Sequence, residues 1–166
     1  MRTITKTLYK FNELSEDAQE KALMHYQASG EQYHWADEAL QSLKEFADAL
    51  NVRLANYEID WLGGTCPSFA TTDNDEHALD AEDAQQVIKN GQDAKWTGYC
   101  ADCACADGFK EAWEAGEREA SELFQAGFAT WLKDTQADAE HQFSYEGYAD
   151  FADANELEFY EDGTLA

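Results

Sequence analysis

The excess of carboxylate groups is what most restricts how this chain can fold. Its 166 residues include 35 acidic and 11 basic residues, which gives a net charge of −24 at pH 7. Because ionised carboxylates are rarely buried without a partner, each helix or strand must turn its acidic residues toward solvent. Five Trp, eight Tyr and nine Phe supply apolar material for a core. We therefore expect a folded chain and not a disordered one.

A surface with this net charge repels nucleic-acid phosphates and anionic membranes. We expect the protein to bind neither directly. Residues 1–11 alternate polar and apolar side chains and lack the apolar run of a signal peptide. No stretch of the sequence approaches the roughly 18 apolar residues that span a bilayer. The sequence thus predicts a cytoplasmic protein.

The acidic excess is greatest in the C-terminal third of the chain. Net charge is −5 over residues 1–60, −6 over residues 61–106 and −13 over residues 107–166. After Lys133 the chain has ten acidic residues and no basic one. Aromatic residues alternate with these acids at amphipathic spacings, which predicts a folded segment with its acids outward.

Hydrophobic periodicity predicts a mixture of strands and helices. Strands are expected over residues 3–11, 52–61, 66–72 and 157–159, and the second and third form a hairpin with a bulge near Asn56. Helices are expected from Ser15 and over residues 36–50, 80–89, 107–133 and 145–154. These elements favour an α+β fold, with several helices packed on an antiparallel or mixed sheet of about four strands. We expect one acidic domain, residues 1–166, whose most acidic part is 107–166.

A stripe of carboxylates is predicted on one face of the expected helix 107–133. At about 100° per residue, Asp107, Glu111, Glu114 and Glu122 fall within about 80° of one another, and Arg118 interrupts them. Like charges at this spacing repel, so the stripe costs helix stability. Together with neighbouring acids of the C-terminal segment, these form the candidate partner-binding set: Asp107, Glu111, Glu114, Glu122, Asp134, Asp138, Glu140, Glu146, Asp150 and Asp153.

Three interpretations of this acidic surface compete: a solubilising coat, adaptation to high salt, and a mimic of nucleic acid. Lys outnumbers Arg eight to three, which argues against salt adaptation. Duplex DNA presents one phosphate per about 3.4 Å of each strand, so a rigid array of carboxylates can occupy a groove built for phosphates. The mimic hypothesis predicts a basic DNA-binding protein as partner.

Sequence motifs give little support to catalysis. The four histidines fit no metalloenzyme pattern, and no phosphate-binding or nucleophile motif occurs. We expect no enzyme activity and no cofactor. Cys66, Cys100, Cys103 and Cys105 could together hold zinc, but a single C-x2-C pair favours free thiols. A small zinc-binding module therefore stays an alternative.

Both ends of the chain resemble a group of small bacteriophage proteins of unestablished activity. The similarity lies in residues 9–22, a strand followed by an L-S-x-x-A-x-x-K-A helix, and in residues 154–163. Residues 145–149, Y-E-G-Y-A, are faintly similar to the tail of the antirestriction protein ArdA. These resemblances imply a protein that acts in the host cytoplasm during infection, against a CRISPR effector or a restriction enzyme. The alternative is an accessory phage protein whose acidity only keeps it soluble.

Overall fold

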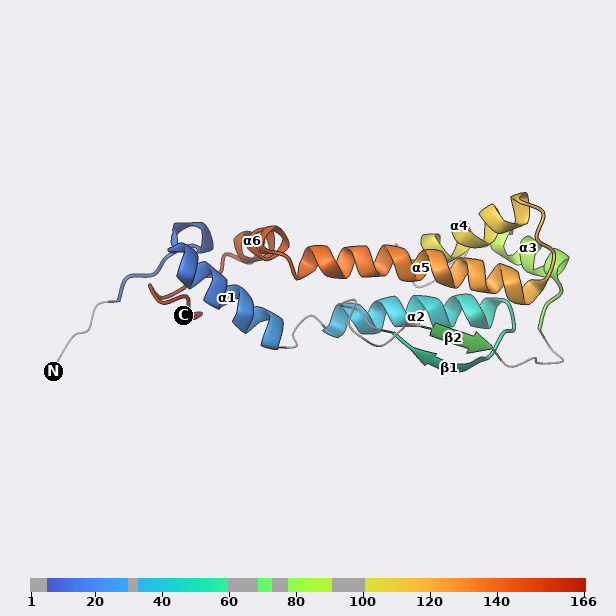
Figure 1. Ribbon diagram of the computed structural model, residues 1–166, viewed down its shortest axis with the longest axis horizontal. Helices are drawn as coiled ribbons and strands as arrows, with labels where there is room; N and C mark the ends of the chain where they lie inside the picture. The colour runs from blue at the N-terminus through green and yellow to red at the C-terminus, as the bar shows by residue number, and fades with distance from the viewer. Residues whose placement is uncertain (1–5, 30–32, 60–68, 73–77, 91–100) are drawn as a thin grey trace. The chain divides into compact units, whose positions relative to one another are not determined.

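Helices make up most of the part of the chain that the structure describes. The structure is a computed structural model, and it describes residues 6–29, 33–59, 69–72, 78–90 and 101–166 (Figure 1). Contacts divide the chain into two compact units. Unit 1 comprises residues 1–33 and 139–166, and unit 2 comprises residues 34–138.

Unit 2 contains four helices and a hairpin within its described residues. The helices are α2 (Tyr33–Ala49), which begins at the boundary with unit 1, α3 (Ala81–Asn90), α4 (Ala101–Glu114) and α5 (Ala120–Gln142), and the strands are β1 (Leu54–Glu58) and β2 (Phe69–Thr72). The last residues of α5 belong to unit 1. Asp80 caps α3 by accepting a 2.9 Å bond from the backbone N–H of Asp83.

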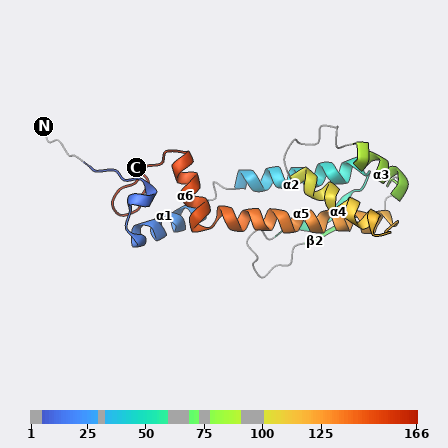
Figure 2. The same ribbon diagram turned by 90° about the horizontal axis from the view of Figure 1, so that it is seen from above.

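The core of unit 2 lies where α2 and α5 run alongside each other (Figures 1 and 2). The rings of Phe46 on α2 and Phe124 on α5 stack with centroids 5.7 Å apart. Trp131 is fully buried, and its indole N–H donates to the Ala39 carbonyl oxygen at 3.2 Å. The inward face predicted for residues 36–50 is confirmed, because Ala39, Leu43, Phe46 and Leu50 are all buried.

The predicted hairpin is confirmed, and so is its bulge. β1 and β2 are antiparallel, and the register shifts between Leu54 and Asn56, next to the residue where the change of alternation indicated a bulge. The expected turn at Gly63 and Gly64 lies outside the described residues.

Unit 1 is built around aromatic side chains. It contains the 3-10 helix η1 (Phe11–Glu13), α1 (Glu16–Ser29) and α6 (Tyr145–Ala154). Phe11, Tyr148 and Phe159 are buried in its core, and the Phe11 ring meets the Tyr148 ring edge-on at 5.0 Å. The bounds predicted for α6 are confirmed. Ser144 begins this helix by accepting a 3.1 Å bond from the backbone N–H of Gly147.

The prediction of a sheet of about four strands is wrong. Within the described residues one two-stranded sheet is present, and the chain ends contribute isolated bridges from Phe159 to Tyr9 and to Leu165. Tyr9 and Phe159 exchange two 2.9 Å backbone bonds. The next residue, Lys10, gives its backbone N–H to the Glu13 carboxylate at 2.7 Å, which turns the chain into η1. Within residues 6–11 the alternation thus corresponds to one bridge and to the burial of Phe11, and residues 3–5 of the predicted strand lie outside the described residues.

The single helix predicted over residues 107–133 is also wrong. Helix α4 ends at Glu114 and α5 begins at Ala120. Gly116 has φ +102°, a conformation that side-chain-bearing residues rarely adopt, and its N–H bonds the Trp113 carbonyl oxygen at 3.0 Å. Arg118 then lies 3.9 Å from the Trp113 ring centroid, which holds the connection between the two helices in place.

Candidate functional site

The break after α4 divides the predicted carboxylate stripe. Asp107, Glu111 and Glu114 stay together on α4, whereas Glu122 lies in the first turn of α5. All four side chains are exposed. The three on α4 fall within about 60° of helix rotation, over an axial length of about 10.5 Å. The predicted four-member stripe on one continuous helix is therefore wrong, and a three-member stripe remains.

A basic residue partly neutralises the α4 stripe. The Lys110 ammonium lies 3.3 Å from a carboxylate oxygen of Asp107. This pair is exposed on the Asp107 side, so it contributes little to stability but reduces the local negative potential. The α4 stripe presents a weaker field than its sequence suggests.

Helix α6 carries a second stripe with the same spacing and no basic residue. Glu146, Asp150 and Asp153 occupy positions i, i+4 and i+7, as do the three acids of α4. All three are exposed, and they lie within about 60° of helix rotation. On the opposite side of α6, Tyr148 and Ala152 are buried in the core of unit 1. The burial of these two side chains fixes the rotation of α6 about its own axis, so the carboxylates on the other side face solvent.

The remaining candidates extend along α5. Asp134 and Asp138 are exposed and one helical turn apart, and Glu140 is exposed near the end of the helix. Unit 2 holds Asp107, Glu111, Glu114, Glu122, Asp134 and Asp138. Unit 1 holds Glu140, Glu146, Asp150 and Asp153. The candidate set is thus divided between the two units.

Both units are strongly acidic. Unit 1 has four basic and 13 acidic residues, a net charge of −9, and unit 2 has seven basic and 22 acidic residues, a net charge of −15. None of the acidic side chains whose exposure the structure describes is buried. The negative charge therefore lies at the surface, where a partner can reach it.

Among the described residues, two carboxyl groups have a pKa shifted by their local bonding. Backbone N–H groups of Glu119 and then Arg118 donate to Glu117 and lower the pKa of its carboxyl. The pKa of Asp162 is lowered by hydrogen bonds from the Thr164 side chain and backbone. Both groups stabilise turns, and neither belongs to the candidate set. The shifts therefore do not indicate an acid–base pair.

Exposed aromatic side chains flank the α6 stripe, and they were not among the predicted site residues. Tyr145 is 47% exposed and Phe151 is 37% exposed. Their rings still contact the core, since Tyr145 lies 5.3 Å from Phe11 and Phe151 lies 5.2 Å from Tyr26. The signal was present in the helical spacing, which places both rings at the border between the buried and the acidic face of α6.

Of the four cysteines that could hold zinc, the structure describes the side chain of one. The Cys105 side chain is fully buried on α4. Cys66, Cys100 and the side chain of Cys103 lie outside what the structure describes. Among the described residues, no three His, Cys, Asp or Glu side chains are grouped in a way that could hold a metal ion.

Comparison of the chain with family models, curated proteins and solved structures finds no match. The resemblance to phage proteins and to ArdA stays a prediction. A search of the described residues finds no helix with the length and apolar character needed to cross a membrane.

Proposed function

We propose that this protein is a non-catalytic, acidic inhibitor of phage type, a DNA mimic that blocks the DNA-binding surface of a host defence protein. The target would be a CRISPR effector or a restriction enzyme in the host cytoplasm. The observation that carries the proposal is the exposed carboxylate stripe of Glu146, Asp150 and Asp153 on α6, a helix with no basic residue. The α4 stripe adds a second array of the same spacing in the other unit.

The density of charge on these helices is comparable with that of a DNA strand. Three carboxylates over about 10.5 Å of helix give one charge per about 5 Å, since each residue rises about 1.5 Å. One DNA strand presents a phosphate per about 3.4 Å. A basic channel that binds DNA by charge can therefore contact the stripe with a similar number of Arg and Lys side chains.

The exposed aromatic side chains beside the α6 stripe favour an interface that combines aromatic packing with charge pairing. Interfaces draw much of their binding energy from partly exposed aromatic anchors that become desolvated, and Tyr is among the residues enriched there. Arg side chains, which are common in DNA-binding channels, also stack on aromatic rings. Tyr145 and Phe151 stand beside the carboxylates that would pair with those Arg side chains.

The proposal is tested by inhibition of DNA cleavage. A plasmid is cleaved by a purified type I restriction enzyme, or by a purified RNA-guided nuclease of the Cas9 class, with increasing amounts of this protein. We expect inhibition of at least one nuclease. Because protein and DNA would compete for one surface, excess duplex DNA should relieve the inhibition, and raising the salt concentration should weaken it.

Paired charge reversals then locate the contact. Glu146→Lys with Asp150→Lys alters the α6 stripe, and Glu16→Lys with Asp17→Lys is the matched control on α1 of the same unit. Both pairs change the net charge by four units, and each includes an acidic residue in the first turn of its helix, Glu146 in α6 and Glu16 with Asp17 in α1. Like-charge juxtaposition at an interface costs several kcal/mol, so the α6 pair should require about tenfold more protein for half-inhibition or worse. The control should change it by much less.

Two results would contradict the proposal. Absence of inhibition in both nuclease assays and in infection of hosts that carry either defence would favour the accessory-protein alternative. An equal loss of inhibition with the two pairs of substitutions would mean that the total charge alone determines binding and that α6 does not contact the nuclease. Melting temperatures of both variants, measured alongside, separate lost contacts from lost folding.

A further inference from the structure

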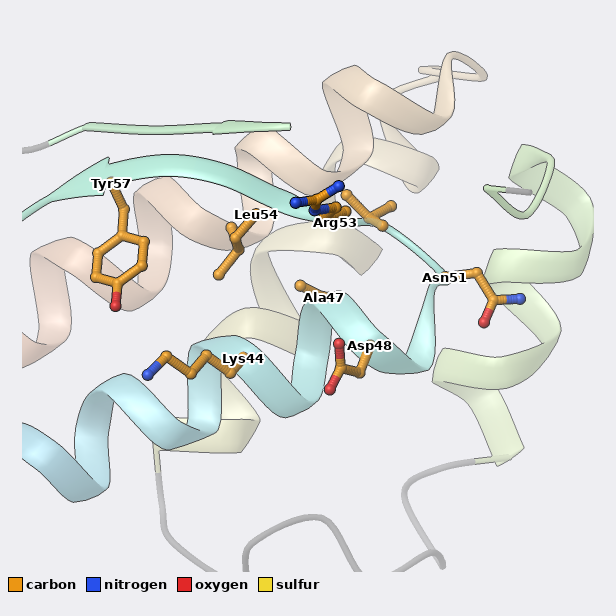
Figure 3. A pocket seen from close by; sticks show the side chains of 8 residues that line it. Lys44, Ala47, Asp48, Asn51, Arg53, Leu54 and Tyr57 are labelled. Carbon is orange, nitrogen blue, oxygen red and sulfur yellow. The ribbon is translucent and has the colours of Figure 1, made fainter. Parts of the chain in front are cut away.

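Aromatic rings at the surface of this protein hold basic side chains of the same chain. In the open groove between α2 and β1, the Lys44 side chain reaches toward the Tyr57 ring (Figure 3). Such a contact is favourable because the face of an aromatic ring is negative. Three rings have a cation 3.9–5.7 Å from their centroid: Trp113 with Arg118, Tyr160 with Lys6, and Tyr57 with Lys44.

The two exposed rings of α6 have no such cation. Among the aromatic side chains whose exposure the structure describes, three are exposed: Tyr57, Tyr145 and Phe151. Tyr57 lies beside Lys44, whereas within the described residues no Lys or Arg group lies over the ring of Tyr145 or Phe151. Helix α6 itself contains no basic residue that could supply one. The two α6 rings are therefore open to a cation from another molecule.

Contacts with other rings of unit 1 hold both side chains in place. The centroid of the Tyr145 ring lies 5.3 Å from that of Phe11, with the two planes inclined at 48°. The Phe151 ring lies 5.2 Å from Tyr26 and 6.3 Å from Tyr148, and its plane is inclined at 21° to that of Tyr148. A ring whose orientation is already fixed loses little side-chain entropy when a cation binds to it.

We propose that Tyr145 and Phe151 bind arginine side chains of the partner, and that α6 therefore selects Arg over Lys. The inference rests on the proposed function, because it assigns the chemistry of the same α6 contact. Glu146 follows Tyr145 and Asp150 precedes Phe151, so each ring has an exposed carboxylate next to it that attracts a cation. Carboxylates attract both kinds of cation. A guanidinium group is planar and more weakly hydrated than an ammonium group, so the rings favour Arg.

Two decapeptides of equal charge test the selectivity, one alternating Arg with Gly and the other alternating Lys with Gly. Their affinities for the full chain are measured by calorimetric titration at physiological salt. We expect the Arg peptide to bind about fivefold more tightly, because each exposed cation–π contact changes affinity by about two- to fivefold. Tyr145→Leu and Phe151→Leu keep apolar side chains against the core. Each should weaken the Arg peptide by about two- to threefold and change the Lys peptide much less.

The matched control is Tyr57→Leu, which removes the exposed ring that lies beside Lys44 in unit 2. It should leave the ratio of the two affinities unchanged, and melting temperatures should show that all variants fold.

Equal binding of the two peptides by the wild-type protein would overturn the arginine sites, as would an unchanged ratio in both α6 variants. If that protein still inhibited a nuclease, the proposed function would stand without this inference. Selectivity for Arg that depends on the α6 rings, in a protein that inhibits no nuclease, would support the arginine sites and contradict the proposed function.

Discussion

Gly127→Ala is expected to destabilise the protein, although Ala is the better helix former. Gly127 lies inside α5, where Ala is favoured over Gly by about 1 kcal/mol. A methyl group there would come 2.7 Å from the Cys105 carbonyl oxygen on α4 and 2.7 Å from the Phe46 ring on α2. Both distances are below any normal carbon contact. The missing side chain is therefore what lets α5 approach its two neighbours.

The size of the destabilisation by Gly127→Ala depends on whether the two neighbouring groups can shift away from the added methyl group. The Cys105 oxygen belongs to a helical backbone, and Phe46 is fully buried and stacked on Phe124. Overpacking of such a site costs about 1–3 kcal/mol, and the rigidity of both neighbours puts this one at the upper end. After the gain in helix propensity, we expect a net loss of about 2 kcal/mol. For a chain of this size that lowers the melting temperature by about 4–8 °C.

Thermal unfolding followed by circular dichroism measures the change. Ala129→Gly is the control in the same helix, because Ala129 is exposed and its replacement changes helix propensity without altering packing. It should lose about 1 kcal/mol. Adding Phe46→Leu to Gly127→Ala should recover part of the stability that the clash removes. A Gly127→Ala protein that melts at or above the wild-type temperature would refute the reasoning.

Two further predictions concern charge. The backbone N–H groups of Glu119 and Arg118 bond the ionised Glu117 carboxylate and lower its pKa in the folded protein. These bonds stabilise the fold fully above the unfolded pKa, near 4.5. The stabilisation is lost as the pH falls through the lower pKa of the folded protein. The melting temperature of Glu117→Gln should therefore lie furthest below that of the wild type at pH 7 and approach it at pH 3, and a constant gap would contradict this. The protein alone should not retard duplex DNA in a gel at physiological salt, because the net charge of −24 repels phosphates, and a shifted band would count against this expectation.

Local signals in the sequence predicted the elements whose boundaries depend on local chemistry. The Ser144 hydroxyl caps helix α6 by accepting a bond from the Gly147 N–H, and such a cap can be recognised from the residue types. The bulge in β1 was visible as a change of alternation, because one extra residue reverses the side-chain pattern. Both features need no knowledge of distant contacts.

Features that depend on distant contacts were not predicted. Gly108, Gly116 and Gly127 look alike in sequence as weak points of one helix. In the structure Gly116 breaks the helix, whereas a methyl group on Gly108 would lie 2.5 Å from the Ala126 carbonyl oxygen. Gly108 and Gly127 are therefore contacts between helices. Because the helical periodicity of apolar residues continues across all three glycines, the sequence predicted one helix with Glu122 on the same face as Asp107. The predicted four-member carboxylate stripe was wrong for this reason.

The α6 stripe illustrates how a helix can keep a charge pattern that does not favour it. A ten-residue helix is too short to be stable in isolation, and its three carboxylates repel one another. Its stability must come from the packing of Tyr148 and Ala152 against Phe11 and Phe159 in unit 1. The aromatic core thus holds the carboxylates at fixed spacing before any partner arrives. A preorganised array loses little conformational entropy on binding, which is an advantage that a flexible acidic tail of the same composition would lack.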